Sequence, residues 1–146
     1  MANLPVVEHW IGGKFDSGSG GRFGDVFNPA LGRAVKKVAF AEVSDVDKAV
    51  ATAKAALPAW RDLSVARRQK VMFAFRDLLE RKVPELAAII TEEHGKVLSD
   101  AAGEIARGLE VVELSTSFPN YIKGEYVENA STGVDVYSLH QALGVV

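Results

Sequence analysis

The chain has 146 residues, of which 48% are hydrophobic and 25% are charged, and its formal net charge is −2. A chain of this length can form one domain with a buried core. Its acidic and basic residues are interspersed, without the basic surface that nucleic-acid-binding proteins carry. No apolar run approaches the ~20 residues that a membrane-spanning helix needs. We therefore expect neither a nucleic-acid partner nor a membrane partner.

Cysteine is absent from the chain. This excludes disulfides, thiolate metal ligands and a cysteine nucleophile within these 146 residues. His9, His94 and His140 are isolated from one another in the sequence, so no metal site is expected. The first ten residues resemble neither a signal peptide nor a transit peptide, which favours a cytoplasmic location.

The first forty residues favour short β-strands separated by glycine-containing turns. Residues 8–16 form two β-prone pieces around Gly12-Gly13, a pair that suits a two-residue hairpin turn. Residues 22–27 and 34–39 predict two further strands, joined by a turn that starts at Asn28-Pro29. Together they would form a small antiparallel layer that needs a packing partner.

Two features of this layer bear on function. The segment 17–21, SGSGG, does not complete a GxGxxG pattern and leads into no helix, so we interpret it as a turn rather than a phosphate-binding loop. Lys36 and Lys37 are predicted on the polar, outer side of the layer.

Three helices are predicted in the middle of the chain. The first starts at Ser44, a favoured capping residue, and should end near Pro58, because proline disfavours helix in the residue before it. The second is capped by Ser64. The third has Pro84 in its first turn and ends at Gly95. Their inward-facing residues are expected to be Val46, Ala49, Val50, Ala53 and Leu57, then Val71, Met72, Phe75, Leu78 and Leu79, and then Leu86, Ala87, Ile89 and Ile90.

The segment 91–113, TEEHGKVLSDAAGEIARGLEVVE, predicts a packed central helix. Its apolar residues recur at steps of four and three, which places them on one stripe. These residues are Leu98, Ala102, Ile105, Leu109 and Val112. Gly103 and Gly108 each cost about 1 kcal/mol relative to alanine inside a helix. We therefore expect a neighbouring backbone to approach them closely.

The same helix carries an arginine flanked by acidic residues. Arg107 lies three residues from both Glu104 and Glu110. Residues at this spacing are neighbours on a helix surface. From the residues alone, Arg107 is therefore interpreted as a member of a surface ion pair.

The C-terminal residues favour two more strands, over 124–130 and 134–139, around Ser131-Thr132-Gly133. Each side of the second strand is apolar with one polar residue, so the pattern leaves open which side faces water. The final residues, 142–146, are typical of the start of a buried strand. We expect them to continue in a longer protein.

Several stretches resemble the N-terminal part of the aldehyde dehydrogenase superfamily. HWIGGKFDSGSG, FNPALGR, DVDKAVATAKAALPAW, RRQKVMF and EHGK resemble its successive landmarks. EHGKVLSDA, RGLEVVE, the KGE at residues 123–125 and the YSL…LGVV ending are closer to the CoA-acylating methylmalonate-semialdehyde dehydrogenases. His140 and Ala142 depart from the arginine and proline expected there.

The resemblance implies an α/β parent fold with a Rossmann-type cofactor domain, of which this chain is an α+β N-terminal piece with small antiparallel strands, about four helices and a strand arm. Residues 1–123 would be the strands and helical layer of the cofactor-binding domain. Residues 124–141 would be oligomerisation-arm strands that join copies into a homo-oligomer. Residues 142–146 would start the first cofactor-domain strand.

The resemblance also implies an activity for the parent enzyme: oxidation of a carboxylate-bearing aldehyde through a cysteine thiohemiacetal, with NAD as hydride acceptor and coenzyme A as acyl acceptor. In that branch the arginine of the RGLEVVE motif, here Arg107, is implicated in holding the substrate carboxylate. Neither catalytic nor cofactor-binding residues are expected in this chain, which should bind no NAD and be inactive alone. Malonate and methylmalonate semialdehyde both remain candidate substrates.

A second hypothesis is a non-catalytic helical interaction module derived from the same family. The residues by themselves favour no reaction, because HExxH, GxSxG and P-loop patterns are absent. The open edges of the predicted arm strands would suit pairing with another chain.

Overall fold

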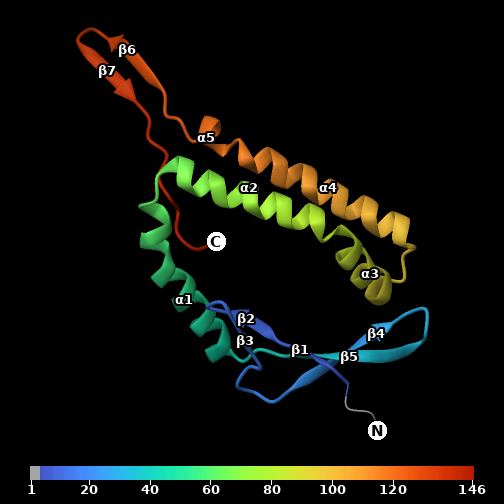
Figure 1. The fold of residues 1–146 in the computed structure, drawn as a ribbon. Coiled ribbons are helices and arrows are strands. Elements are labelled where there is room, and N and C mark those ends of the chain that lie inside the picture. Colours follow the sequence, from blue (N-terminus) through green and yellow to red (C-terminus); the bar gives the residue numbers. More distant parts are fainter. Residues whose placement is uncertain (1–3) are drawn as a thin grey trace.

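The computed structural model describes residues 4–146, which form a layer of helices with small strands at each end of the chain (Figure 1). Five strands come first, namely β1 (Val6–Val7), β2 (His9–Ile11), β3 (Lys14–Asp16), β4 (Phe23–Asn28) and β5 (Arg33–Ala39). The helices are α1 (Val43–Arg61), α2 (Val65–Arg81), α3 (Val83–His94), α4 (Leu98–Thr116) and α5 (Phe118–Tyr121). Strands β6 (Tyr126–Ser131) and β7 (Val134–Tyr137) follow. This order confirms the predicted α+β arrangement and adds the short helix α5.

The N-terminal strands form two small sheets. Strands β2 and β3 pair antiparallel. Gly12 and Gly13 in their turn have φ angles of 62° and 79°, which confirms the predicted hairpin. The other sheet has the order β1-β5-β4, with β4 antiparallel and β1 parallel to β5. The turn between β4 and β5 starts as predicted at Asn28, whose side-chain oxygen accepts the backbone N–H of Ala30 at 3.0 Å.

Lys36 does not lie on an outer, polar side as predicted. Its Nζ donates to Glu92 Oε2 at 2.6 Å and to Glu93 Oε1 at 3.0 Å, and its side chain is only 23% exposed. These hydrogen bonds raise the pKa of Lys36. The sequence could not reveal this contact because the lysine and the two glutamates are more than fifty positions apart. The cluster joins β5 to the last turn of α3.

Helix α1 differs from its prediction at both ends. Its N-cap is Glu42 rather than Ser44, and the Asp45 carboxylate accepts the Glu42 N–H at 2.8 Å. The helix also continues past Pro58 to Arg61, with the Asp62 N–H donating to the Pro58 carbonyl at 3.0 Å. A proline inside a helix removes one hydrogen bond, and the turns on either side of Pro58 nevertheless remain helical.

Helices α2, α3 and α4 form the packed part of the chain. Ser64 caps α2, Pro84 lies in the first turn of α3, and Gly95 ends α3 with a φ of 86°, all as predicted. Helix α4 lies alongside α2 and contacts α3 (Figure 1). The buried cluster consists of Ala87, Ala101 and Ile105. Leu79, Val83, Leu86, Ile90 and Ala102 pack against it.

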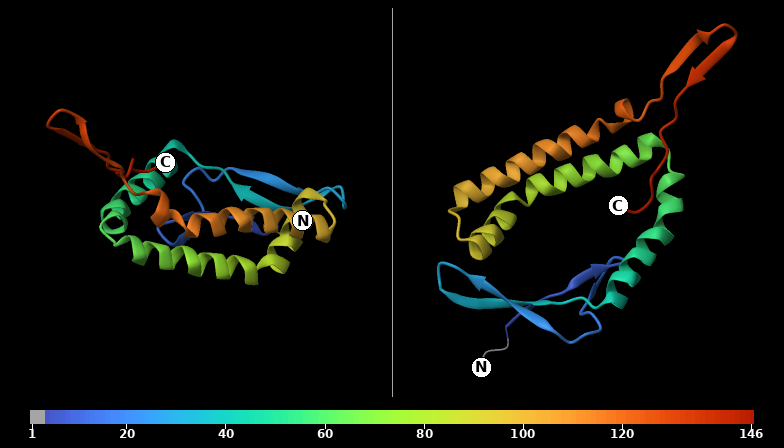
Figure 2. Two further views of the ribbon diagram at one scale, coloured as in Figure 1. Left: turned by 90° about the horizontal axis from the view of Figure 1, so that it is seen from above. Right: turned by 180° about the vertical axis from the view of Figure 1, so that it is seen from behind.

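Strands β6 and β7 form a hairpin that projects away from the helices (Figure 2). Both of its faces are exposed, with Val136 51% and Tyr137 68% accessible to solvent. Asp135 stabilises the hairpin because its carboxylate accepts the Tyr126 hydroxyl at 2.7 Å and the Asn129 N–H at 2.9 Å. Residues 138–146 have no regular secondary structure here, so the strand expected at 142–146 stays a prediction. Across residues 4–146, every helix falls short of the length and apolarity that a membrane span requires.

The end of α3 provides the first testable prediction. Gly95→Ala should lower the free energy of unfolding by about 1–2 kcal/mol, because a side chain disfavours positive φ. The new Cβ would also lie 2.8 Å from Pro29 Cγ. Gly108→Ala is the matched control: its Cβ would meet nothing within 4 Å, so it should stabilise α4 by about 1 kcal/mol. Urea unfolding of both variants measures these changes, and equal effects would contradict the role of Gly95.

Candidate functional site

Arg107 lies on the exposed side of α4, away from the helices that α4 packs against. The buried residues Ala101 and Ile105 face the core, together with the partly buried Leu109 and Val112 of the predicted stripe. Because the core fixes the rotation of α4, Arg107 is directed outward. It lines an open hollow of about 310 Å³. The lining residues are Lys96, Ser99, Asp100, Gly103, Glu104 and Arg107.

The glycines of α4 do not meet a neighbouring backbone, contrary to expectation. A Cβ at Gly103 or at Gly108 would find no atom within 4 Å. Gly103 instead lines the hollow one turn before Arg107. A side chain at position 103 would project into this hollow, which the glycine leaves open. Gly103 was missed as a site residue; its spacing of four from Arg107 was the available signal.

The predicted ion pair between Arg107 and its flanking glutamates is absent. Within residues 4–146, neither Glu104 nor Glu110 forms a salt bridge with Arg107. Glu104 pairs with Lys96 Nζ, from the link between α3 and α4. This hydrogen bond is the main cause that lowers the pKa of Glu104, and the charges of Lys96, His94 and Arg107 add to it.

Asp100, the other acidic residue that lines the hollow, is poorly placed to pair with the Arg107 guanidinium. Asp100 lies seven residues before Arg107, which corresponds to about 10 Å along the helix axis. The guanidinium therefore faces the hollow without a carboxylate partner among the described residues. A guanidinium presents a planar set of N–H donors that matches a carboxylate in two-point contact. The Arg107 guanidinium thus has N–H donors of the kind that a small anion would accept.

The glycine-rich loop before β4 does not suit a nucleotide phosphate. Its backbone N–H groups already donate to carboxylates, from Gly18 to Asp16 Oδ1 at 2.9 Å and from Ser19 to both oxygens of Asp45 at 3.1 Å. Asp45 is 7% exposed and ties this loop to α1. A phosphate would face these negative charges, so the loop is a poor cofactor site.

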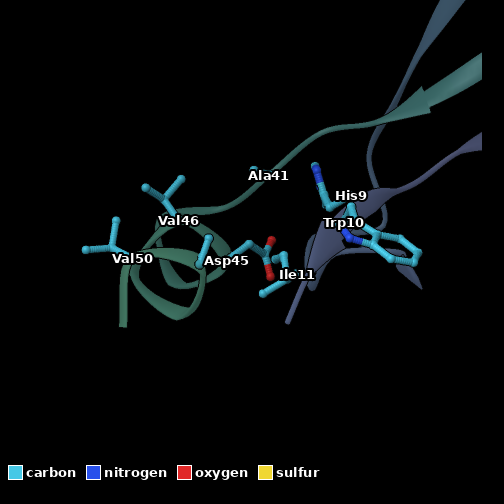
Figure 3. Close-up of a pocket in the computed structure, with 8 residues that line it drawn as sticks. His9, Trp10, Ile11, Ala41, Asp45, Val46 and Val50 are labelled. Carbon is cyan, nitrogen blue, oxygen red and sulfur yellow. The ribbon is translucent and has the colours of Figure 1, made fainter. Parts of the chain in front are cut away.

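A second hollow, of about 300 Å³, lies between β2 and α1 (Figure 3). Its walls are mainly apolar, and the carboxylate that lines it, that of Asp45, is already hydrogen-bonded. Val46 and Val50, predicted to face inward, line this hollow and are 53% and 37% exposed. Among residues 4–146, the prediction that these two side chains face inward is therefore not confirmed.

Two arginines of α2 differ in the groups that they contact. Arg76 forms ion pairs with Glu80 and Glu113, so its charge is satisfied by neighbouring acidic residues. Arg68 lies with its guanidinium 5.6 Å from the Phe118 ring centre and borders a third hollow, of about 400 Å³, with His140. This packing anchors α5 on α2.

Residues 4–146 thus form an α+β chain in which the Arg107 guanidinium lines an open hollow without a carboxylate partner among the described residues. The sequence profile of the aldehyde dehydrogenase family matches residues 15–146. The chain therefore belongs to the aldehyde dehydrogenase family.

Individual relatives give a finer comparison. The chain is 43% identical to the malonate-semialdehyde dehydrogenase of Pseudomonas aeruginosa, over 98% of this chain and 29% of that protein. It is also 43% identical to the acylating mitochondrial methylmalonate-semialdehyde dehydrogenase of Arabidopsis thaliana, over 97% of this chain and 23% of that protein.

A solved structure has the same fold over nearly the whole chain. A Sinorhizobium meliloti protein, described as a putative methylmalonate-semialdehyde dehydrogenase and crystallised with NAD, superimposes with a TM-score of 0.93 at 40% identity. The match covers 99% of this chain and 29% of that protein. The chain thus spans less than a third of the length of the relatives it matches.

The ion pair in the hollow predicts a pH dependence. Because the pKa of Glu104 is lowered in the folded chain, its pairing stabilises the fold at neutral pH, and this contribution is lost as the pH falls through the lowered pKa. The comparison is made in an Arg107→Ala background, so that the arginine cannot replace Lys96 as the partner of Glu104. There, Lys96→Met should raise the pKa of Glu104 toward its ordinary value, measured by NMR titration of the side-chain carboxyl. Lys82→Met removes a comparable exposed pair with Glu85 and should leave Glu104 unchanged. A Glu104 pKa that is the same with and without Lys96 would contradict the pairing.

Proposed function

We propose that this chain is the N-terminal part of an NAD-dependent, CoA-acylating dehydrogenase for malonate or methylmalonate semialdehyde, and that Arg107 binds the substrate carboxylate. The observation that carries the proposal is the guanidinium of Arg107, which faces an open hollow without a carboxylate partner among residues 4–146. The relatives named above support the substrate class.

The proposed role of Arg107 is to hold and orient the substrate. Both semialdehydes carry a carboxylate close to the aldehyde group. Two-point binding of this carboxylate would fix the direction in which the aldehyde carbon points, and fixed orientation contributes to catalysis. NAD, when bound elsewhere in the enzyme, accepts the hydride. The nucleophile and the groups that bind NAD and coenzyme A would lie outside this chain, which contains no cysteine.

We infer structural roles for the remaining parts of the chain. Residues 1–123 would belong to the cofactor-binding domain without contacting NAD, and residues 142–146 would enter its first strand. The hairpin within 124–141 would pair with another copy, because its strands have open edges and apolar side chains on both faces. The enzyme is proposed to act in the cytoplasm.

The test joins this chain to the part of the Pseudomonas aeruginosa relative that follows the matched segment. The chimera should form NADH from malonate semialdehyde, NAD and coenzyme A, while the 146-residue chain alone should form none. A folded, soluble chimera without activity would contradict the proposal, and so would reproducible NADH formation by the chain alone.

A substitution in the chimera tests the site. Arg107→Ala should lower kcat/KM for malonate semialdehyde about 10- to 150-fold, because a hydrogen bond to a charged group contributes about 1.5–3 kcal/mol. The effect on propanal, which lacks a carboxylate, should be small. Arg81→Ala, at the exposed end of α2, is the matched control and should change neither value. Equal losses on both aldehydes after Arg107→Ala would mean that Arg107 has only a structural role.

A further inference from the structure

Whether the Arg107 guanidinium is free to bind an anion depends on which cation pairs with Glu104. Glu104 lies three residues before Arg107, a spacing at which opposite charges on one helix form pairs. The structure nevertheless pairs Glu104 with Lys96, and Arg107 forms no salt bridge within residues 4–146. Lys96 therefore engages a carboxylate that could otherwise pair with Arg107.

Lys96 is well placed for this task. It lies in the short link between the end of α3 at His94 and the start of α4 at Leu98, and its side chain is 27% exposed. The link is anchored on its N-terminal side, where the Gly95 N–H donates to the Thr91 carbonyl at 3.0 Å. The amine thus approaches Glu104 from outside helix α4, on the wall of the same hollow.

We propose that Lys96 is a positioning residue that holds Glu104 and thereby keeps Arg107 open for the carboxylate of the substrate. This inference rests on the proposed function, because it concerns the same hollow, and adds a specificity-determining residue to it. In this proposal Lys96 acts mainly by engaging Glu104, and its charge also balances those of Asp100 and Glu104 in the hollow.

Two physical effects give Lys96 this influence. A carboxylate on the same helix competes strongly with a dissolved substrate, because its pairing with Arg107 costs no translational freedom. The charges of the hollow also matter. With Lys96 present, two cationic and two acidic side chains line it; without Lys96, Asp100 and Glu104 outnumber Arg107 and would repel an anion.

The first test uses the 146-residue chain and NMR of the Arg107 Nε–Hε group. As a single substitution with Lys96 retained, Glu104→Gln should leave the Arg107 signal nearly unchanged, because Glu104 pairs with Lys96. In Lys96→Met, the Arg107 signal should shift, and adding Glu104→Gln should reverse the shift. Lys82→Met serves as the control and should not move the signal. An Arg107 signal that is unaffected by Lys96→Met would overturn the inference.

The second test uses the chimera described above. Lys96→Met should raise KM for malonate semialdehyde about 2- to 5-fold, the scale of one surface ion pair, and leave KM for propanal unchanged. The double variant Lys96→Met/Glu104→Gln should restore the original KM. This rescue separates release of Glu104 from a general loss of structure, which a second substitution would not repair.

The outcomes separate the inference from the proposed function. If Arg107→Ala affects both aldehydes equally, the carboxylate-binding role fails, whatever Lys96 does. If Arg107→Ala is selective but Lys96→Met raises KM to the same extent with and without the added Glu104→Gln substitution, the proposed function stands and the role of Lys96 is overturned.

Discussion

The packing of α4 against α2 and α3 is the constraint on which the candidate site depends. Ala101 has no exposed surface and Ile105 is nearly buried, so this side of α4 cannot rotate toward solvent without exposing apolar surface. Small residues at Ala87 and Ala101 let the helices approach closely. Once these residues face the core, helical geometry places Gly103 and Arg107 on the opposite side. The hollow is therefore a consequence of the core.

The remainder of the chain is held mainly by polar contacts between its parts. Lys36 joins the β4–β5 sheet to α3, and Asp45 joins the glycine-rich loop to the start of α1. Apolar burial is small, and side chains such as Val46 and Tyr137 are exposed on α1 and on the β6–β7 hairpin. Large exposed apolar surfaces are typical of regions that contact other protein surfaces. The proposed function gives these surfaces such partners, in the other part of the enzyme and in a second copy.

The hollow combines two features that separately have ordinary explanations. An exposed arginine is normally solvated, and an exposed Lys–Glu pair such as that of Lys96 and Glu104 contributes little to stability. Together these features leave Glu104 paired with Lys96, and they leave the Arg107 guanidinium unpaired and facing the hollow among the described residues. The glycine at 103 keeps the space beside the guanidinium open. Substrate selection would thus depend on a few residues from one helix and the link before it.

The sequence by itself determined the local elements, most of the apolar stripe of α4 and the family. Leu98, the first residue of the predicted stripe, is instead 57% exposed. Turn residues such as Gly12-Gly13 and Gly95 act within a few positions, and the stripe follows from a period of about 3.6 residues, so each can be read from neighbouring letters. Tertiary structure alone decided which charges meet. Lys36 with Glu92, and Lys96 with Glu104 rather than Glu104 with Arg107, depend on how separate elements approach in space. Helix α1 continues past Pro58 to Arg61 although residues 58–61 are exposed, so the preference of proline against helix in the residue before it did not end this helix.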